Sequence, residues 1–350
     1  MQIILSKKYF FLIFVLLTAS SCSKPVVTKF ERCNIFGACI NVEFESKTSG
    51  TGITATIEND LDYLVSILNP VNSKPMLRLN SLLRSGEWAS VNPSVFTLVT
   101  KSKEYYKSSL GYFDPARNGL LIKLWKIAAN AEPGMPSLSP SKKAYESVAQ
   151  TAATMDDIEL QGIRVRSTNT NIALDFGTLL HGYTVDMVFD YLKSTGAKNI
   201  RVVLGNTIRI STKENTPRIE SISPLHGKTG ATTVTMKNGE ALCVSRLHDN
   251  DAALGGPRYT TIFNPKTGKP APDTGAVIVI HQNAMIANAA CQALFNAGPT
   301  GWQKVDKSMQ TIASLYLSTT GKLQMKMPML QRIELNSQKN RNKASQGERK

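Results

Sequence analysis

LDFGTLLHGYTVDMVFDYL, residues 174–192, places an aspartate, a glycine-containing turn and a histidine directly before an apolar pattern with helical spacing. The pattern predicts an amphipathic helix from Tyr183 to a stop at Gly196. The apolar residues of its buried face are Val185, Val188, Phe189 and Leu192. Free amides at a helix start and the helix dipole both favour a bound phosphate. Glycines also occupy such turns for steric reasons alone, so the turn by itself leaves two interpretations open.

The segments around this stretch mix helical and strand patterns without strict alternation. We therefore predict an α+β fold, with mixed sheets and packed helices. Helical patterns lie at 57–69, 93–110, 135–152 and 283–299, the last ended by Gly298 and Pro299. Strand or hairpin patterns lie at 39–46, 157–177, 200–210, 258–272 and 276–281. The segment 111–125 is predicted to be a turn followed by a short apolar segment.

The N-terminus has the pattern of a secretory signal. Two lysines precede an apolar run at 9–17, and a small-residue stretch, TASSC, ends at Cys22. This run is far shorter than the roughly 20 residues needed to span a bilayer. The stretch resembles a bacterial lipobox, although Ala19 stands where leucine is commoner. We predict a signal peptide over 1–21 and a lipid anchor on Cys22, which would hold the chain on the periplasmic side of a bacterial cell membrane. Secretion without a lipid is the alternative.

Length and charge bound the remaining possibilities. The chain after the signal is long enough for a large core, in one elaborate domain or in two smaller lobes, and we assign residues 22–335 to one domain. The tail at 336–350 lacks apolar periodicity and is predicted to be a solvated, disordered end. The formal net charge of +15 indicates an anionic partner, which could be a nucleotide phosphate, an anionic lipid or nucleic acid. Export and the lack of an aromatic-rich basic motif argue against nucleic acid.

Cysteines follow the predicted signal at positions 33, 39, 243 and 291. An exported protein could pair Cys33 with Cys39 across a short loop. Free, half-buried thiols at these positions are the alternative. The sequence contains no C-x-x-C pair or His/Cys cluster that would indicate a zinc site.

Five sequence segments, taken together and in order, indicate a protein family more specifically than any single turn does. They are GYFDPARNGLLIKLW (111–125), LDFGTLLHGYTVD (174–186), VVLGNTIRI (202–210), RYTTIFNPKTGKP (258–270) and NAMIANAACQALF (283–295). They resemble, in the same order, segments of the ApbE family of flavin transferases. The family patterns are G-A-F-D-P with L-x-x-L-W, D-L-G-G-x-x-K-G-Y-x-x-D, N-L-G-G-D-I, R-Y-x-H-I-I-D-P-x-T-G-x-P and A-M-x-A-D-A-x-x-T-A-L-F. The resemblance covers most of the chain after the signal and implies the T-fold-related architecture of that family.

The resemblance also implies a reaction. Such enzymes bind FAD and Mg²⁺, transfer the FMN moiety through a phosphoester bond to a threonine or serine of a target flavoprotein, and release AMP. In phosphoryl transfer from a pyrophosphate, a cation neutralises charge on the phosphate oxygens while a base takes the proton of the attacking hydroxyl. The implied partners are FAD and an acceptor subunit of an exported or membrane redox system, with membrane contact through the lipid anchor and no nucleic acid.

Site residues follow from the same resemblance. The implied cofactor contacts are Phe36, Tyr112, Phe113, Asp114, Asp175, His181 and Phe263. The implied metal ligands are the backbone carbonyl of Thr178 and the side chains of Asn288 and Gln292. The implied catalytic positions are Thr261 and Asn264.

The metal positions depart from the family pattern. Asn288 stands where the family has an aspartate, and Gln292 stands where it has a hydroxyl ligand. A spacing of four residues still puts both side chains on one helix face. Both offer amide oxygens, yet neither carries charge. Thr207 likewise replaces the aspartate of L-G-G-D.

The catalytic positions depart as well. Thr261 replaces the histidine thought to act as base, and Asn264 replaces the following aspartate. His248 and His281 are candidate substitutes for that base. Two functions are therefore compatible with the sequence. The first, our primary hypothesis, is an FAD:protein FMN transferase, and the second is a catalytically silent FAD-binding or partner-docking lipoprotein of the same fold.

Overall fold

A computed structural model of the chain describes residues 25–47, 49–69, 72–129, 140–213, 216–222, 232–246, 262–271 and 273–335. The predicted signal peptide, Cys22 and the tail at 336–350 lie outside these ranges. Every helix within them is too short or too polar to span a bilayer.

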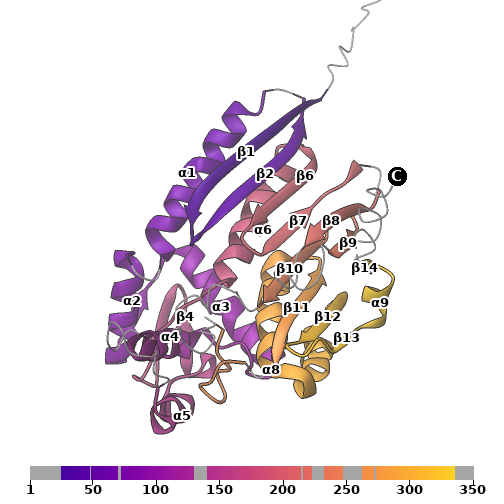
Figure 1. Cartoon of the computed structure of the whole chain (residues 1–350). Helices are drawn as coiled ribbons and strands as arrows, with labels where there is room; N and C mark the ends of the chain where they lie inside the picture. The colour runs from indigo at the N-terminus through magenta and orange to yellow at the C-terminus, as the bar shows by residue number, and fades with distance from the viewer. Residues whose placement is uncertain are drawn as a thin grey trace, which may run out of the picture.

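An eight-stranded sheet forms the centre of the fold (Figure 1). Its strands lie in the order β1-β2-β6-β7-β10-β11-β12-β13, and each neighbouring pair is antiparallel. Short turns join β1 to β2, β6 to β7 and β12 to β13, whereas α8 (Ala284–Met309) lies between β11 and β12 along the chain. The bounds are β1 Val26–Ile35, β2 Ala38–Ser46, β6 Lys198–Leu204, β7 Thr207–Ile210, β10 Ala241–Arg246, β11 Thr274–His281, β12 Ala313–Ser318 and β13 Leu323–Met325.

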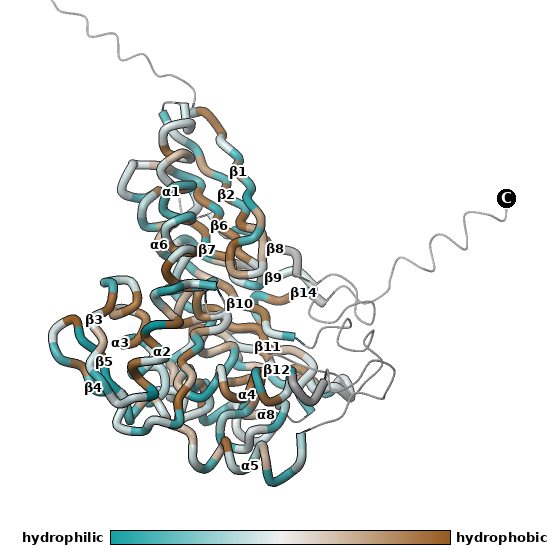
Figure 2. The backbone as a smooth tube through the Cα atoms, turned by 90° about the vertical axis from the view of Figure 1, so that its left-hand side faces the viewer, coloured by the Kyte–Doolittle hydropathy of each residue, from teal (hydrophilic) through white to brown (hydrophobic). Residues whose placement is uncertain are grey.

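Three helices, α1 (Thr51–Leu68), α6 (Leu179–Ser194) and α8 (Ala284–Met309), cover one face of this sheet. The main core lies between them and the strands and includes Phe44 of β2 and Phe189 of α6. Strand β11 is buried along nearly its whole length, as expected for an apolar run covered on both faces. Figure 2 shows the same pattern, with hydrophobic segments concentrated along β11 and β12.

A second core lies on the opposite face of the β7–β12 half of the sheet. Side chains such as Ile278 and Leu315 pack there with Met236 of β9 and Met329 of α9. Strands β8, β9 and β14 form a small antiparallel sheet. The bounds are β8 Arg218–Ile222, β9 Thr232–Met236, α9 Met327–Leu330 and β14 Ile333–Leu335.

The remaining described elements gather at the end of the molecule away from the start of β1, in both views (Figures 1 and 2). They include a three-stranded sheet of order β3-β5-β4. The bounds are α2 Lys74–Ser85, β3 Ala89–Ser90, α3 Pro93–Ser108, α4 Pro115–Ala129, α5 Lys142–Thr151, a 3₁₀ turn Met155–Asp157, β4 Ile158–Gln161 and β5 Arg164–Ser167.

The predicted α+β class is confirmed, but one local prediction is wrong. The segment after Asp114 is a full helix, α4, rather than a short apolar segment. Asp114 accepts a hydrogen bond from the Ala116 amide (3.2 Å), and Pro115 opens the first turn, an arrangement typical of helix starts. The prediction that Gly298 and Pro299 end the last helix is confirmed for the first helical segment of α8. The chain leaves helical geometry only at Gly298 (φ +67°, ψ −170°), and Pro299 begins a second helical segment that ends at Met309.

A disulfide joins Cys33 to Cys39 at the closed end of the β1–β2 hairpin. This is one of the two cysteine arrangements that the sequence left open, while Cys243 and Cys291 are free and fully buried. Between the bonded cysteines the chain turns through Phe36 and Gly37, which have φ values of +48° and +81°. The disulfide therefore links the two strands directly beside the turn that carries Phe36.

Candidate functional site

The turn before α6 is the first component of the site. Gly177 has φ +54°, a conformation that glycine adopts at little cost, and its amide donates to Asp175 Oδ1 (2.8 Å). The amides of Leu179 and Leu180 bond carbonyls of the same turn. These amides are therefore already satisfied, contrary to the expectation of free donors at this helix start. Burial raises the pKa of Asp175, against the Gly177 amide and the charge of Lys126.

A close approach between α6 and α8 sets the position of this turn. A β carbon on Gly182 would lie 2.6 Å from the carbonyl oxygen of Ala284 and 2.7 Å from Met285 Cα, so only glycine fits. One turn later, Asp186 accepts hydrogen bonds from the amides of Ala284 and Met285 (2.9 Å each). Arg209 lies 2.7 Å from the same carboxylate. Burial raises the pKa of Asp186 to about 6, although Arg209 and both amides oppose this shift.

A line of contacts connects the hairpin turn to α8. His181 Nε2 lies 3.1 Å from the carbonyl oxygen of Phe36, which can only accept, so Nε2 carries a proton. His181 Nδ1 lies 3.4 Å from Asn206 Oδ1, and Thr207 Oγ1 donates to that oxygen (3.2 Å). Asn288 Nδ2 in turn donates to Thr207 Oγ1 (2.7 Å). Two predicted cofactor residues and one predicted metal ligand thus belong to one connected set.

Three buried amide side chains follow one another on α8 at intervals of four residues. They are Asn288, Gln292 and Asn296, with exposed fractions of 1%, 9% and 1%. The side-chain oxygen of each lacks a hydrogen-bond partner among the described residues. Asn296 Nδ2 donates to the carbonyl of Tyr112 (3.0 Å), so its oxygen is the unpaired atom. A buried polar atom without a partner is costly, so these three oxygens are candidate atoms for holding a ligand or ion.

The predicted segment Tyr112–Asp114 lies between α3 and α4, beside the end of this amide row. Asp114 is 5% exposed and pairs with Arg117 Nε at 3.0 Å. Arg117 also donates to the carbonyls of Ala149 (2.6 Å) and Pro265 (2.9 Å), which ties the segment to its surroundings. Burial raises the pKa of Asp114 to about 7, against the charge of Arg117 and two amide hydrogen bonds.

A cavity of about 400 Å³ adjoins this segment. Its lining includes Lys107, Asp114, Arg117 and Lys266. Lys266 Nζ also lies 4.1 Å from the centre of the Tyr112 ring, and burial followed by the charge of Lys304 lowers its pKa. The lining also includes Asp156, so three basic side chains face two acidic ones, and Arg117 is already paired with Asp114. Lys107 and Lys266, with the nearby Tyr112 ring, are the groups that would suit an anionic ligand with a planar part.

The rings of two predicted cofactor contacts, Phe113 and Phe263, are buried against other aromatic side chains of the protein. Phe113 is 1% exposed and packs edge-to-face on Tyr105, with ring centres 6.4 Å apart. Phe263 is 4% exposed and stacks on Trp125 at 5.5 Å. Asn264 closes the following turn, where Oδ1 accepts from the Lys266 amide and Nδ2 donates to the Asn296 carbonyl (2.9 Å each). The roles assigned to these three residues stay predictions.

Three predicted residues, Cys22, His248 and Thr261, lie outside the described ranges. The other candidate base, His281, ends β11. Its Nδ1 accepts the amide of Asn283 (3.1 Å), and burial lowers its pKa. His281 is therefore neutral, with its proton on Nε2, and the nitrogen that could accept a proton is already bonded.

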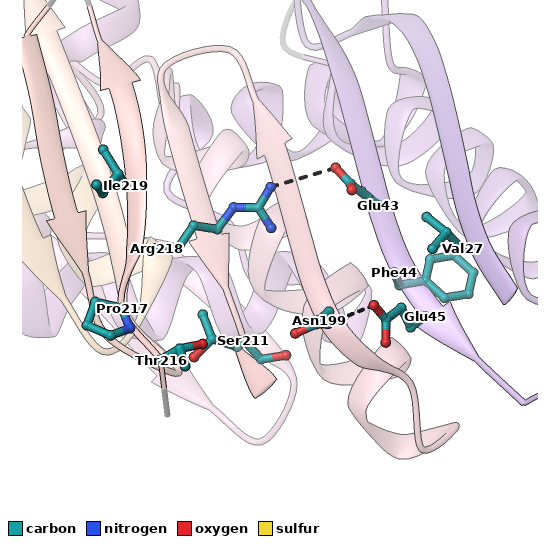
Figure 3. A pocket seen from close by; sticks show the side chains of 11 residues that line it. Val27, Glu43, Phe44, Glu45, Asn199, Ser211, Thr216, Pro217, Arg218 and Ile219 are labelled. Atoms are coloured by element: carbon teal, nitrogen blue, oxygen red, sulfur yellow. Dashed lines mark hydrogen bonds and ion pairs between the residues drawn. The ribbon is translucent and has the colours of Figure 1, made fainter. Parts of the chain in front are cut away.

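A further cavity, of about 490 Å³, opens between β2, β6 and β8 (Figure 3). Arg218 lies 3.7 Å from Glu43, and Asn199 Nδ2 donates to Glu45 (2.8 Å). Its polar side chains thus largely satisfy one another, and none of the predicted site residues lines it.

Sequence reasoning missed Asn206, Asn296 and the helix-capping role of Asp186. Asn296 had a usable signal, because it continues the four-residue spacing of Asn288 and Gln292 along one helix face. Asn206 had none, since its contact with His181 joins a strand turn to a helix 25 residues earlier.

The fold and these positions agree with one class of protein: the chain belongs to the ApbE family, whose profile matches residues 36–316. The predicted resemblance is confirmed. A FAD:protein FMN transferase of Rhodobacter capsulatus is 26% identical over 259 residues, covering 73% of this chain and 48% of that relative. A FAD:protein FMN transferase of Vibrio cholerae serotype O1 is 22% identical over 313 residues, covering 87% and 92%. The chain thus spans about half of the first relative and most of the second.

The solved structure of the flavin transferase ApbE from Vibrio cholerae superposes with a TM-score of 0.72. The two sequences are 20% identical, and the match covers 88% of this chain and 100% of that chain. At this identity the similarity establishes the shared fold.

Proposed function

We propose that the protein transfers the FMN moiety of FAD to a threonine or serine hydroxyl of an acceptor flavoprotein and releases AMP. Membership of the ApbE family gives the reaction class. The observation that carries the proposal is the pair of unpaired, buried oxygens on Asn288 and Gln292, placed on a helix that packs against the start of α6.

In this reaction the acceptor hydroxyl oxygen attacks the phosphorus of the FMN phosphate. The bond from that phosphorus to the bridging oxygen breaks, AMP leaves with the bridging oxygen, and the hydroxyl proton is lost. The positive end of the α6 dipole would stabilise the pyrophosphate, although the turn amides are mostly bonded. Lys107 and Lys266 of the cavity beside Tyr112 would hold another anionic or planar part of the dinucleotide.

The residues present fit a magnesium ion. Asn288 Oδ1 and Gln292 Oε1 are unpaired acceptors, and the Thr178 carbonyl accepts one amide, that of His181 (2.9 Å), which leaves a lone pair. Mg²⁺ takes oxygen ligands and commonly shares them with substrate phosphates. When bound, it would supply charge neutralisation at the phosphate oxygens.

Neither histidine in the described residues is placed as a general base. His181 Nε2 lies against the Phe36 carbonyl and its Nδ1 lies 3.4 Å from Asn206 Oδ1, so both ring nitrogens already face protein oxygens. The acceptor nitrogen of His281 is bonded to the Asn283 amide. A general base contributes about 10²- to 10⁴-fold to such reactions. We therefore expect slow turnover.

The proposal extends to the setting of the reaction. A lipid anchor on Cys22 would place the protein on the periplasmic side of a bacterial cell membrane, and the acceptor would be a subunit of an exported or membrane redox system. The supporting observation is the signal and lipobox pattern at 1–22. Labelling with a radioactive fatty acid tests the anchor, since Cys22→Ser should remove the label.

The test of function uses the purified chain with FAD, Mg²⁺ and an acceptor domain, scored as covalent flavin fluorescence on a denaturing gel. We expect a fluorescent band that disappears with EDTA and is lost in Asn288→Ala. Gln303→Ala, an exposed amide on the same helix, is the matched control and should retain the band. FAD binding without a band, while a known transferase labels the same acceptor, would instead support the silent binder.

A further inference from the structure

The donor set on α8 is neutral, and the hydrogen bonds around it fix which atoms face the ligand. Thr207 Oγ1 gives its proton to Asn206 Oδ1 and accepts from Asn288 Nδ2. The Asn288 amide group is thereby oriented, with Nδ2 toward β7 and Oδ1 turned away from it. Asn288 Oδ1 and Gln292 Oε1 are then acceptor atoms without a partner among the described residues.

The nearest carboxylates along these elements are already engaged. Asp186 binds two amides of α8 and Arg209, and Asp175 binds the amide of Gly177. The oriented side chains of α8 therefore present oxygen dipoles and no negative charge. Desolvation of a divalent cation is costly, and neutral amides compensate for it less than a carboxylate does.

A pyrophosphate would supply the missing charge. Its oxygens are strong ligands for Mg²⁺, which usually keeps several waters and is bound by few protein groups together with substrate phosphates. Two neutral oxygens at a spacing of four residues suffice to orient such a complex, although they do not suffice to capture the bare ion.

We propose that this amide site does not load a divalent cation by itself, and that the species bound is the complex of the cation with the dinucleotide pyrophosphate. The inference rests on the proposed function. The substrate is then the metal–dinucleotide complex, and the affinities for the metal and for FAD depend on each other. Because binding linkage is reciprocal, FAD must raise the affinity for the cation by the same factor as the cation raises the affinity for FAD.

The test follows Mn²⁺, used in place of Mg²⁺, by the loss of its free-ion electron paramagnetic resonance signal. Wild-type full chain alone should leave the signal unchanged up to millimolar protein. Addition of FAD should remove the signal in proportion to protein, beyond a blank of FAD alone. In parallel, quenching of FAD fluorescence should give an affinity at least tenfold higher with Mn²⁺ than with EDTA.

The variant Asn288→Asp supplies the missing carboxylate and should take up Mn²⁺ without FAD, at least tenfold more tightly than wild type. Gln303→Glu adds a charge on the exposed side of the same helix and should behave as wild type. The wild-type titrations decide the proposal on their own if Asn288→Asp fails to fold, which its unfolding midpoint reports.

Uptake of Mn²⁺ by wild-type protein alone, as tight as in Asn288→Asp, would overturn the inference. Equal FAD affinity with and without Mn²⁺ would overturn it as well. Both results leave the transferase assignment standing if the gel assay gives a band. Failure to bind FAD under any condition would instead remove the proposed function.

Discussion

Replacing Gly182 by alanine tests the contact that joins α6 to α8. The added β carbon would lie 2.6 Å from the Ala284 carbonyl oxygen and 2.7 Å from Met285 Cα. Because ordinary heavy-atom contacts are about 3.5 Å, the two helices must separate by about 1 Å or distort. Such overpacking costs about 1–3 kcal/mol.

The same movement strains the cap that Asp186 provides to the Ala284 and Met285 amides. Hydrogen bonds to a charged group are worth about 1.5–3 kcal/mol, and alanine regains about 1 kcal/mol of helix propensity over glycine. The expected net loss is therefore about 1.5–5 kcal/mol of unfolding free energy. FAD affinity should fall too, because His181 and Asn288 lie on the separated helices.

Urea unfolding measures the stability, and quenching of flavin fluorescence measures the affinity. Gly52→Ala is the matched control: this glycine also lies in a helix, but no atom lies within 4 Å of its added β carbon. The control should gain about 0.5–1 kcal/mol. Identical midpoints for Gly182→Ala and wild type would refute the packing argument.

Two further predictions concern stability. Reduction of the Cys33–Cys39 disulfide, which closes a loop with a sequence separation of 6, should lower the unfolding free energy by about 2 kcal/mol in urea titrations. Reductant should then have no effect on the Cys33→Ser/Cys39→Ser double variant. Folding raises the pKa of Asp114 from 3.8 to about 7, so its stabilisation is complete below about pH 4 and is lost as pH rises through about 7. Wild type should therefore lose about 2–3 kcal/mol more than Asp114→Asn between pH 5 and 8, at about 1.4 kcal/mol per pH unit up to the folded pKa, and parallel pH profiles would contradict this.

The elements predicted correctly are those with strong local signals. Helix α6 has a regular apolar spacing and a stop at Gly196, which has φ +79°. Strand β1 was missed because most of its residues are exposed at a sheet edge, so its pattern lacks a continuous buried face. Helix α4 was missed because a helix start at Asp114 and Pro115 has the same residues as a turn.

The candidate site also contains some residues that local motifs could predict and some contacts that they could not. Resemblance located Asp175, His181 and Asn288, since these positions are set by local motifs. The contacts that join His181 to Asn288 run through Asn206 and Thr207, which lie far from α6 and α8 along the chain and meet them only in the tertiary fold. The orientation of the Asn288 amide depends on that contact, and no pattern along the chain encodes it.

The β1–β2 hairpin also sets the distance between the start of the sheet at Val26 and the contact between Phe36 and His181. The described chain enters the sheet near Val26, and β1 continues for 10 residues before the turn at Phe36, whose carbonyl contacts His181 (Figure 1). At about 3.3 Å per residue, this strand holds the site roughly 30 Å from the point where the chain enters. If the chain is anchored upstream of Val26, as proposed, the sheet places His181 far from the point where the chain enters it. The proposed acceptor would then have to present its hydroxyl at a similar distance from that point.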